Sequence, residues 1–167
     1  MKKLIIITGT PGTGKSTLAR AIAKKYKLFR LDLHKYYQKV SVSYNKQKQC
    51  YDVDLQKLEQ LVQKTMQEHP QGVIFDSHIS HLLPKRIVQL CIVLTCSNLK
   101  ELEKRLKRRK YSQAKIKENL EAEIFQVCLE EAQERGHKIK VIDTSLKPST
   151  KMMLQQILNS KNRILPP

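Results

Sequence analysis

Residues 9–16 read Gly-Thr-Pro-Gly-Thr-Gly-Lys-Ser, and this stretch decides the fold. It fits G-x-x-x-x-G-K-[ST] at every required position, where the glycines permit backbone conformations that turn successive N–H groups toward phosphate oxygens. An isoleucine-rich run, Lys3–Thr8, precedes it, and Ser16–Lys25 follows with its apolar residues on one helical stripe. A buried strand, a glycine turn and an amphipathic helix in this order predict a phosphate-binding P-loop.

Two side chains of the loop have a specific chemical task. Lys15 can reach the β- and γ-phosphates of a nucleoside triphosphate, and the Ser16 hydroxyl can bind Mg²⁺. The alternative, a chance glycine turn, does not explain the flanking strand and helix. A guanine motif of the Asn-Lys-x-Asp type is not found, because Asn45-Lys46-Gln47-Lys48 lacks the aspartate.

The rest of the chain alternates strand and helix patterns. Further strands are predicted at Leu28–Leu33, Gly72–Asp76, Leu90–Thr95 and Lys138–Asp143, and helices at 54–68, 99–109, 112–135 and 150–158, with Gly136 as a C-cap. Such alternation predicts an α/β fold with a five-stranded parallel sheet and helices on both faces. With 167 residues and no linker, we expect one domain over residues 1–167.

The amino-acid composition indicates the compartment and the kinds of partner to expect. No apolar run approaches the roughly 18–20 residues that span a bilayer, so no membrane association is expected. The four cysteines form no C-x-x-C pairs, which predicts a reducing compartment, the cytoplasm or a eukaryotic nucleus. The net charge of +17 would attract polyanions such as nucleotide or RNA, or it reflects a solvated, lysine-rich surface.

Asp76 ends the apolar run Gly-Val-Ile-Phe, where a Walker-B-type carboxylate would orient Mg²⁺ beside the P-loop. His78 follows two residues later at the same sheet edge, where ligands bind in open α/β folds. It could position a water, transfer a proton or contact phosphate, or it is a structural histidine.

Residues 104–110 carry six cations in seven positions. Arg105, Arg108 and Arg109 share one face of the predicted helix, and arginines there could clamp phosphates or stack on adenine. A solvated helix end is the alternative, which suits Lys104 and Lys107 better than Arg105 and Arg109.

These residues resemble the adenylate kinase isoenzyme 6 family, also described as coilin-interacting nuclear ATPases. Four segments are similar in order and spacing: Thr8–Thr17; Asp76-Ser-His78 with Leu83-Pro84; Arg105 to Tyr111; and Glu118 to Ala132. The last segment is long and idiosyncratic. The resemblance covers nearly the whole chain except residues 34–53 and the C-terminal tail.

The resemblance implies a nucleoside-monophosphate-kinase fold with an acceptor-binding region near residues 31–54 and a short lid near 108–118. It implies transfer of phosphate from ATP to AMP-like acceptors, ATP hydrolysis, and a Mg²⁺ site at Ser16 and Asp76. ATP phosphates would bind Gly12, Thr13, Gly14, Lys15, Ser16 and Thr17, while Asp76 and His78 take the Walker-B-like role and Arg109 contacts the nucleotide from the lid.

The family also resembles factors that bind a small-subunit ribosomal protein during rRNA maturation, and we expect a monomer. This chain departs from the family at two places. Asp32 and Lys35 occupy the tentative acceptor site, where Lys35 replaces an arginine and loses its bidentate fork. Lys110 stands where a glycine is usual.

Three hypotheses remain at this stage: an adenylate-kinase-like phosphotransferase with intrinsic ATPase activity, an ATP-switched assembly factor for the small ribosomal subunit, and a kinase for nucleic-acid ends.

Overall fold

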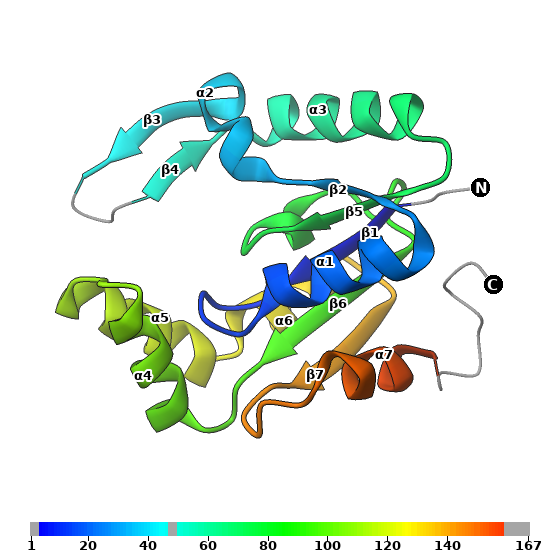
Figure 1. Ribbon diagram of the computed structural model, residues 1–167. Helices are drawn as coiled ribbons and strands as arrows, with labels where there is room; N and C mark the ends of the chain where they lie inside the picture. The colour runs from blue at the N-terminus through cyan, green and yellow to red at the C-terminus, as the bar shows by residue number, and fades with distance from the viewer. Residues whose placement is uncertain (1–3, 47–49, 159–167) are drawn as a thin grey trace.

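A parallel β-sheet forms the centre of the molecule in the computed structural model, which describes residues 4–46 and 50–158 (Figure 1). Lys3, residues 47–49 of the predicted acceptor region and the C-terminal tail lie outside this part. The strand order is β2-β5-β1-β6-β7. The strands are β1 (Leu4–Thr8), β2 (Phe29–Leu31), β5 (Val73–Asp76), β6 (Leu90–Thr95) and β7 (Ile139–Asp143). All neighbours in this sheet run parallel, which confirms the predicted α/β class.

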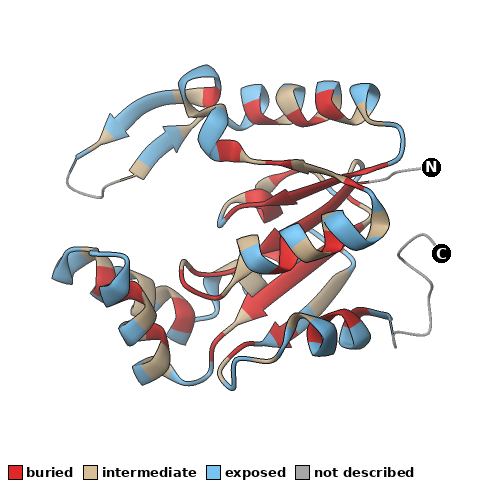
Figure 2. Cartoon of the chain, viewed as in Figure 1, coloured by how far each residue is buried: buried red, intermediate tan, exposed pale blue. Residues whose placement is uncertain are grey.

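Alternation along β1 divides the core into two layers. Ile5 and Ile7 pack with α1 (Lys15–Tyr26) and α7 (Thr150–Leu158), whereas Leu4 and Ile6 pack with α3 (Leu55–Glu68) and α6 (Val127–Glu134). All five residues of β1 are buried, because helices cover both faces of the central strand (Figure 2).

The predicted helix over 112–135 is wrong in one respect, because it is two helices. α5 (Gln113–Ile124) and α6 are separated by Gln126, whose φ of 50° is left-handed. Glu123 at the end of α5 is buried and accepts a hydrogen bond of 2.6 Å from the backbone N–H of Cys96. This fixed end forces the chain to turn before α6 can lie on the sheet. Gly136 follows α6 with φ 69°, as a C-cap glycine does.

A second, two-stranded sheet was not predicted. β3 (Ser41–Asn45) and β4 (Cys50–Val53) form an antiparallel hairpin that projects from the core beside α2 (Tyr37–Val40) (Figure 1). Their residues are partly or fully exposed, so the hairpin has no apolar face that a sequence pattern would reveal. β2 is shorter than predicted, because Asp32 caps a 3₁₀ turn, η1 (Leu33–Lys35).

The remaining elements flank the site. α4 (Leu99–Arg108) follows β6, and a second 3₁₀ turn, η2 (Ser80–Leu82), follows β5. No helix in the described ranges is both long enough and apolar enough to cross a bilayer.

Candidate active site

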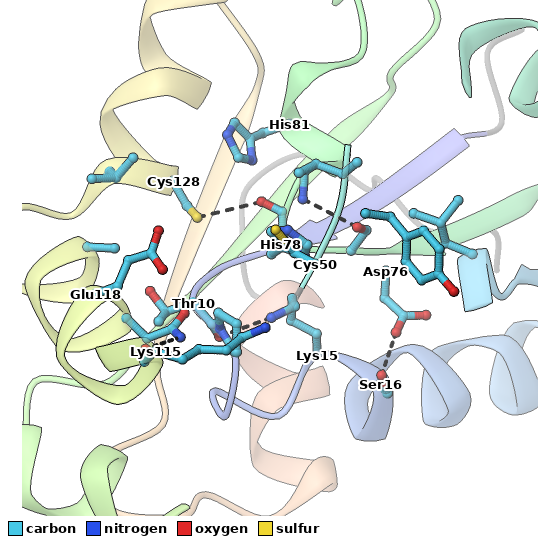
Figure 3. A pocket seen from close by; sticks show the side chains of 18 of the residues that line it. Thr10, Lys15, Ser16, Cys50, Asp76, His78, His81, Lys115, Glu118 and Cys128 are labelled. Carbon is cyan, nitrogen blue, oxygen red and sulfur yellow. Dashed lines mark hydrogen bonds between the residues drawn. The ribbon is translucent and has the colours of Figure 1, made fainter. Parts of the chain in front are cut away.

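The P-loop opens onto a cavity of about 630 Å³ at the carboxyl edge of the sheet. Lys15, Ser16, Asp76 and His78 line it together with Arg109 from the end of α4. Figure 3 shows the first four converging on the same space from the P-loop and the end of β5. Residues 60 positions apart in sequence therefore meet in one site, because β1 and β5 are neighbouring parallel strands.

Two glycines of the P-loop are fixed by close packing. A Cβ on Gly9, whose φ is 133°, would lie 2.2 Å from the carbonyl oxygen of Leu94. Gly12, at φ 91°, would place a Cβ 3.1 Å from the Leu102 side chain. The loop therefore lies directly against β6 and α4, and a side chain at Gly9 would displace it.

Lys15 is held inside the loop. Its Nζ donates hydrogen bonds to the carbonyl oxygens of Gly9 at 2.7 Å and Thr10 at 3.0 Å. Burial lowers the pKa of Lys15 from 10.5 to about 8, so the amine is still mostly protonated at neutral pH. An anion in the cavity would meet a cation that is desolvated and already oriented.

Asp76 accepts hydrogen bonds from two partners. The Ser16 hydroxyl donates to Oδ2 at 2.7 Å, and Arg30 donates from Nε to Oδ1 at 2.7 Å and from Nη2 to Oδ2 at 2.9 Å. Sequence reasoning missed Arg30. The signal was a cation in the middle of an otherwise apolar strand, β2, which is paired with the strand that ends in Asp76.

His78 faces Lys15 across the cavity (Figure 3). Although the His78 side chain is exposed to the cavity, desolvation by the surrounding protein, reinforced by the charges of Lys15 and Lys115, lowers its pKa from 6.5 to about 4. The imidazole is therefore neutral at pH 7. In this form it can accept one hydrogen bond and donate another, as a water-positioning residue must.

Arg105 and Arg109 do not act on the same space, although they share a helix face. Arg109 is the C-cap of α4 and lines the large cavity. Arg105 donates to the carbonyl oxygens of Gly12 at 3.4 Å and Thr144 at 2.8 Å, and lines a second cavity of about 240 Å³ on the other side of the P-loop. Thr13 and Thr17 line this second cavity, and Gly14 lines both cavities.

The residues predicted for the acceptor lie away from the cavity. Asp32 accepts a hydrogen bond of 3.2 Å from the backbone N–H of His34 and lies 3.6 Å from Arg30. Lys35 is exposed and does not line either cavity. His34 and Tyr37, from the same segment, do line the large cavity.

Three tyrosines form a wall of the large cavity, which we call the tyrosine wall: Tyr37, Tyr44 and Tyr51. The rings of Tyr37 and Tyr51 stack with centroids 4.4 Å apart, and Tyr44 is tilted against Tyr51 at 4.9 Å. Tyr44 and Tyr51 remain 50% and 41% exposed. Sequence analysis did not single them out, because only the hairpin brings them together.

Comparison with known proteins shows the family to which this sequence belongs. A family model described as an AAA domain matches residues 5–126. The adenylate kinase isoenzyme 6 homolog of Schizosaccharomyces pombe is 40% identical over 133 residues, which cover 78% of this chain and 74% of the relative. The homolog of Dictyostelium discoideum is 35% identical over 165 residues, covering 98% and 90%. The chain belongs to the adenylate kinase isoenzyme 6 family.

Other relatives agree with this assignment. A putative adenylate kinase of Pyrococcus furiosus is 35% identical over 159 residues, covering 95% of this chain and 84% of the relative. A solved structure of deoxyadenosine kinase from M. mycoides shares the fold, with a TM-score of 0.58 at 17% identity over 93% of this chain and 97% of that one. The protein is an adenylate-kinase-like P-loop nucleotide kinase.

One residue between α4 and α5 has a strained backbone. Lys110, where the resemblance led us to expect a glycine, has a φ of 57°. A left-handed backbone costs a side-chain-bearing residue about 1–2 kcal/mol. The turn between α4 and α5 therefore places a lysine in a conformation that favours glycine.

The oxygen atoms of Ser16 and Asp76 suit Mg²⁺, a hard cation that prefers one or two protein oxygens, phosphate oxygens and water. Within the described ranges, no group of three or more His, Cys, Asp or Glu side chains is arranged to hold a metal ion by itself. A Mg²⁺ ion here would be held by Ser16 and Asp76 together with phosphate oxygens, and its chemistry would be to neutralise phosphate charge.

Proposed function

We propose that this protein transfers the γ-phosphate of ATP to AMP or a similar nucleoside monophosphate, and that it also hydrolyses ATP. The observation that supports the proposal is the convergence of Lys15, Asp76 and Arg109 on one cavity that also has an aromatic wall. Phosphoryl transfer needs positioned cations around the transferring group and little covalent chemistry from the protein.

The donor nucleotide fits across the P-loop. Its phosphates would bind the loop N–H groups and Lys15, with Mg²⁺ at Ser16 and Asp76. Its adenine would lie in the smaller cavity beside Arg105. Glu101 holds that guanidinium through a hydrogen bond of 3.1 Å, and the Thr144 carbonyl holds it at 2.8 Å, so its planar face is fixed for stacking on a base.

The acceptor would use the tyrosine wall in place of a fixed arginine. Among the described residues of the acceptor region, His34 is the basic side chain that lines the large cavity, while Lys35 is outside it. We infer that the acceptor base stacks on the tyrosines, and that its phosphate is held from the lid side by Arg109 and Lys115.

The decisive assay mixes the protein with ATP, Mg²⁺ and AMP and follows ADP. The expected result is ADP formation well above the hydrolysis seen without AMP. Lys15→Ala should abolish both activities, because it removes the cation at the β- and γ-phosphates. Tyr51→Ala should raise KM for AMP several-fold and leave KM for ATP unchanged. Equal ADP formation with and without AMP would refute phosphotransfer.

A second function is favoured by a surface feature. Lys104, Lys107, Arg108 and Lys110 are all exposed around the end of α4, beside the cavity, in a chain of net charge +17. We propose as the alternative that ATP switches this protein as an assembly factor that binds a small-subunit ribosomal protein or rRNA. ATP-dependent co-purification with pre-ribosomal particles would support it, and no binding to either component at modest salt would count against it.

A further inference from the structure

A hydrogen-bonded chain of three side chains, Thr8, His81 and Glu131, lies in the wall of the large cavity and is not used by the proposed reaction; its Glu131 end is 45% exposed. The Thr8 hydroxyl is 2.6 Å from Nδ1 of His81, and Nε2 of His81 is 2.7 Å from a carboxylate oxygen of Glu131. Thr8 is completely buried, and the His81 side chain is 3% exposed. Figure 3 shows His81 above the cavity, on the side of α6.

The direction of each hydrogen bond follows from chemistry. A carboxylate can only accept, so Nε2 of His81 must donate its proton to Glu131. Burial lowers the pKa of His81 below its ordinary 6.5, although the bond to Glu131 opposes this, so the ring is neutral at neutral pH. A neutral imidazole that donates from Nε2 accepts at Nδ1. The Thr8 hydroxyl therefore donates to Nδ1 of His81 at 2.6 Å, and its other contact, with the His78 carbonyl oxygen at 3.4 Å, is the longer one.

Thr8, at one end of the hydrogen-bonded chain, lies next to the residue that orients Lys15. Thr8 is the last residue of β1 and precedes Gly9, whose carbonyl oxygen accepts the 2.7 Å hydrogen bond from Lys15. Gly9 is itself packed against the backbone of β6, so it has little freedom to adjust independently of Thr8. A shift of Thr8 would move the carbonyl group that orients the Lys15 ammonium.

The other end of the hydrogen-bonded chain lies on α6. Glu131 lies on α6, which continues from α5 through the left-handed turn at Gln126. η2 is fixed to the end of α6 by two more contacts. Arg135 donates to the Leu82 carbonyl at 2.9 Å, and His137 is 2.8 Å from the His81 carbonyl oxygen through Nε2. α6 and the strand that leads into the P-loop are thus joined through His81.

We propose that His81 is a positioning residue for phosphoryl transfer: it joins Glu131 on α6 to Thr8 and so sets where the P-loop holds Lys15. This inference rests on the proposed function, because it assigns His81 an effect on the same transfer step. His81 acts through Thr8 and Gly9 and makes no contact with substrate in this role.

Two substitutions of His81 each remove one of its two side-chain hydrogen bonds. His81→Asn places an oxygen near the position of Nδ1, so it keeps an acceptor for Thr8 and loses the bond to Glu131. His81→Gln places an amide N–H near Nε2, so it keeps the bond to Glu131 and loses Thr8. Thr8→Val removes the same contact from the other side, and the double variant Thr8→Val with His81→Gln tests whether both act through one bond.

The expected results differ between variants. His81→Gln and Thr8→Val should each lower kcat about tenfold with KM for ATP within twofold, since one buried hydrogen bond is worth about 1 kcal/mol or slightly more. The double variant should lose no more than either single variant, and His81→Asn, which cuts the link to Glu131, should also lower kcat with KM for ATP within twofold. Thr65→Val is the matched control, because it removes a buried threonine hydroxyl bonded to the Leu61 carbonyl in α3, far from the cavity.

Several outcomes would overturn the proposal: a wild-type kcat in His81→Gln or in His81→Asn, multiplicative losses in the double variant, or a change confined to KM. A wild-type protein without turnover would refute the proposed function instead. The positioning role is then decided by nitrogen NMR of the Lys15 ammonium, which should shift in Thr8→Val and not in Thr65→Val. Because it compares Thr8→Val with Thr65→Val, this measurement also tests the positioning role if a His81 variant fails to fold.

Discussion

Replacing Arg30 with methionine tests how far the buried Asp76 carboxylate depends on its guanidinium partner. The Asp76 side chain is 3% exposed and that of Arg30 is 19% exposed, and two short hydrogen bonds join them. Methionine keeps much of the volume and removes both donors. Asp76 would retain only its 2.7 Å contact with Ser16 among the bonds described above.

The size of the effect follows from that geometry. A hydrogen bond to a charged group contributes about 1.5–3 kcal/mol, and breaking a buried ion pair from one side costs about 3–5 kcal/mol. Because Arg30 is partly accessible, water replaces some of the lost interaction, so we expect Arg30→Met to lower the free energy of unfolding by about 2–3 kcal/mol. For a chain of this size, that corresponds to a Tm lower by about 4–12 °C.

Thermal or urea unfolding measures this loss, first without ligand and then with ATP and Mg²⁺. The deficit should shrink when ATP and Mg²⁺ are added, because a divalent cation at Asp76 replaces the missing positive charge. Arg86→Met is the matched control, since Arg86 pairs with Glu59 on the surface with its side chain 64% exposed, and its loss should cost less than about 1 kcal/mol. Equal stability of the two variants would refute the dependence of Asp76 on Arg30.

Three further outcomes follow from the structure. Gly9→Ala should abolish nucleotide binding and destabilise the fold far more than Gly14→Ala, because an added Cβ meets backbone at the first position and open space at the second; comparable unfolding midpoints would contradict this. Lys110→Gly should raise the free energy of unfolding by about 0.5–1 kcal/mol by relieving a left-handed φ, whereas Lys107→Gly inside α4 should lower it by about 1 kcal/mol. Burial lowers the pKa of His81 in the folded state, so the unfolded state takes up its proton first and stability should fall as pH drops below about 6.5. Urea titrations at pH 7.5 and 5.5 should show a smaller fall in His81→Asn, and an equal fall would contradict the assignment.

The sequence was sufficient for the donor half of the site because its signals are local. A P-loop needs glycines, a lysine and a hydroxyl at fixed spacing, and the strand and helix that flank it are recognised from adjacent residues. The position of Asp76 and His78 at the sheet edge was also predictable, since a carboxylate that ends an apolar strand lies at that edge. The parallel order of the strands then brought them to Lys15.

What only the tertiary structure decided depends on contacts between distant segments. Arg30 reaches Asp76 because β2 and β5 are paired, and the tyrosine wall exists because a hairpin without an apolar face folds Tyr44 onto Tyr51. Gln126 ends one helix and begins another because Glu123 is held by the backbone of Cys96, which no helical periodicity encodes. Thr8, His81 and Glu131 likewise come from three separate elements. Local patterns determine which groups the chain has, and packing across the sheet determines which of them meet.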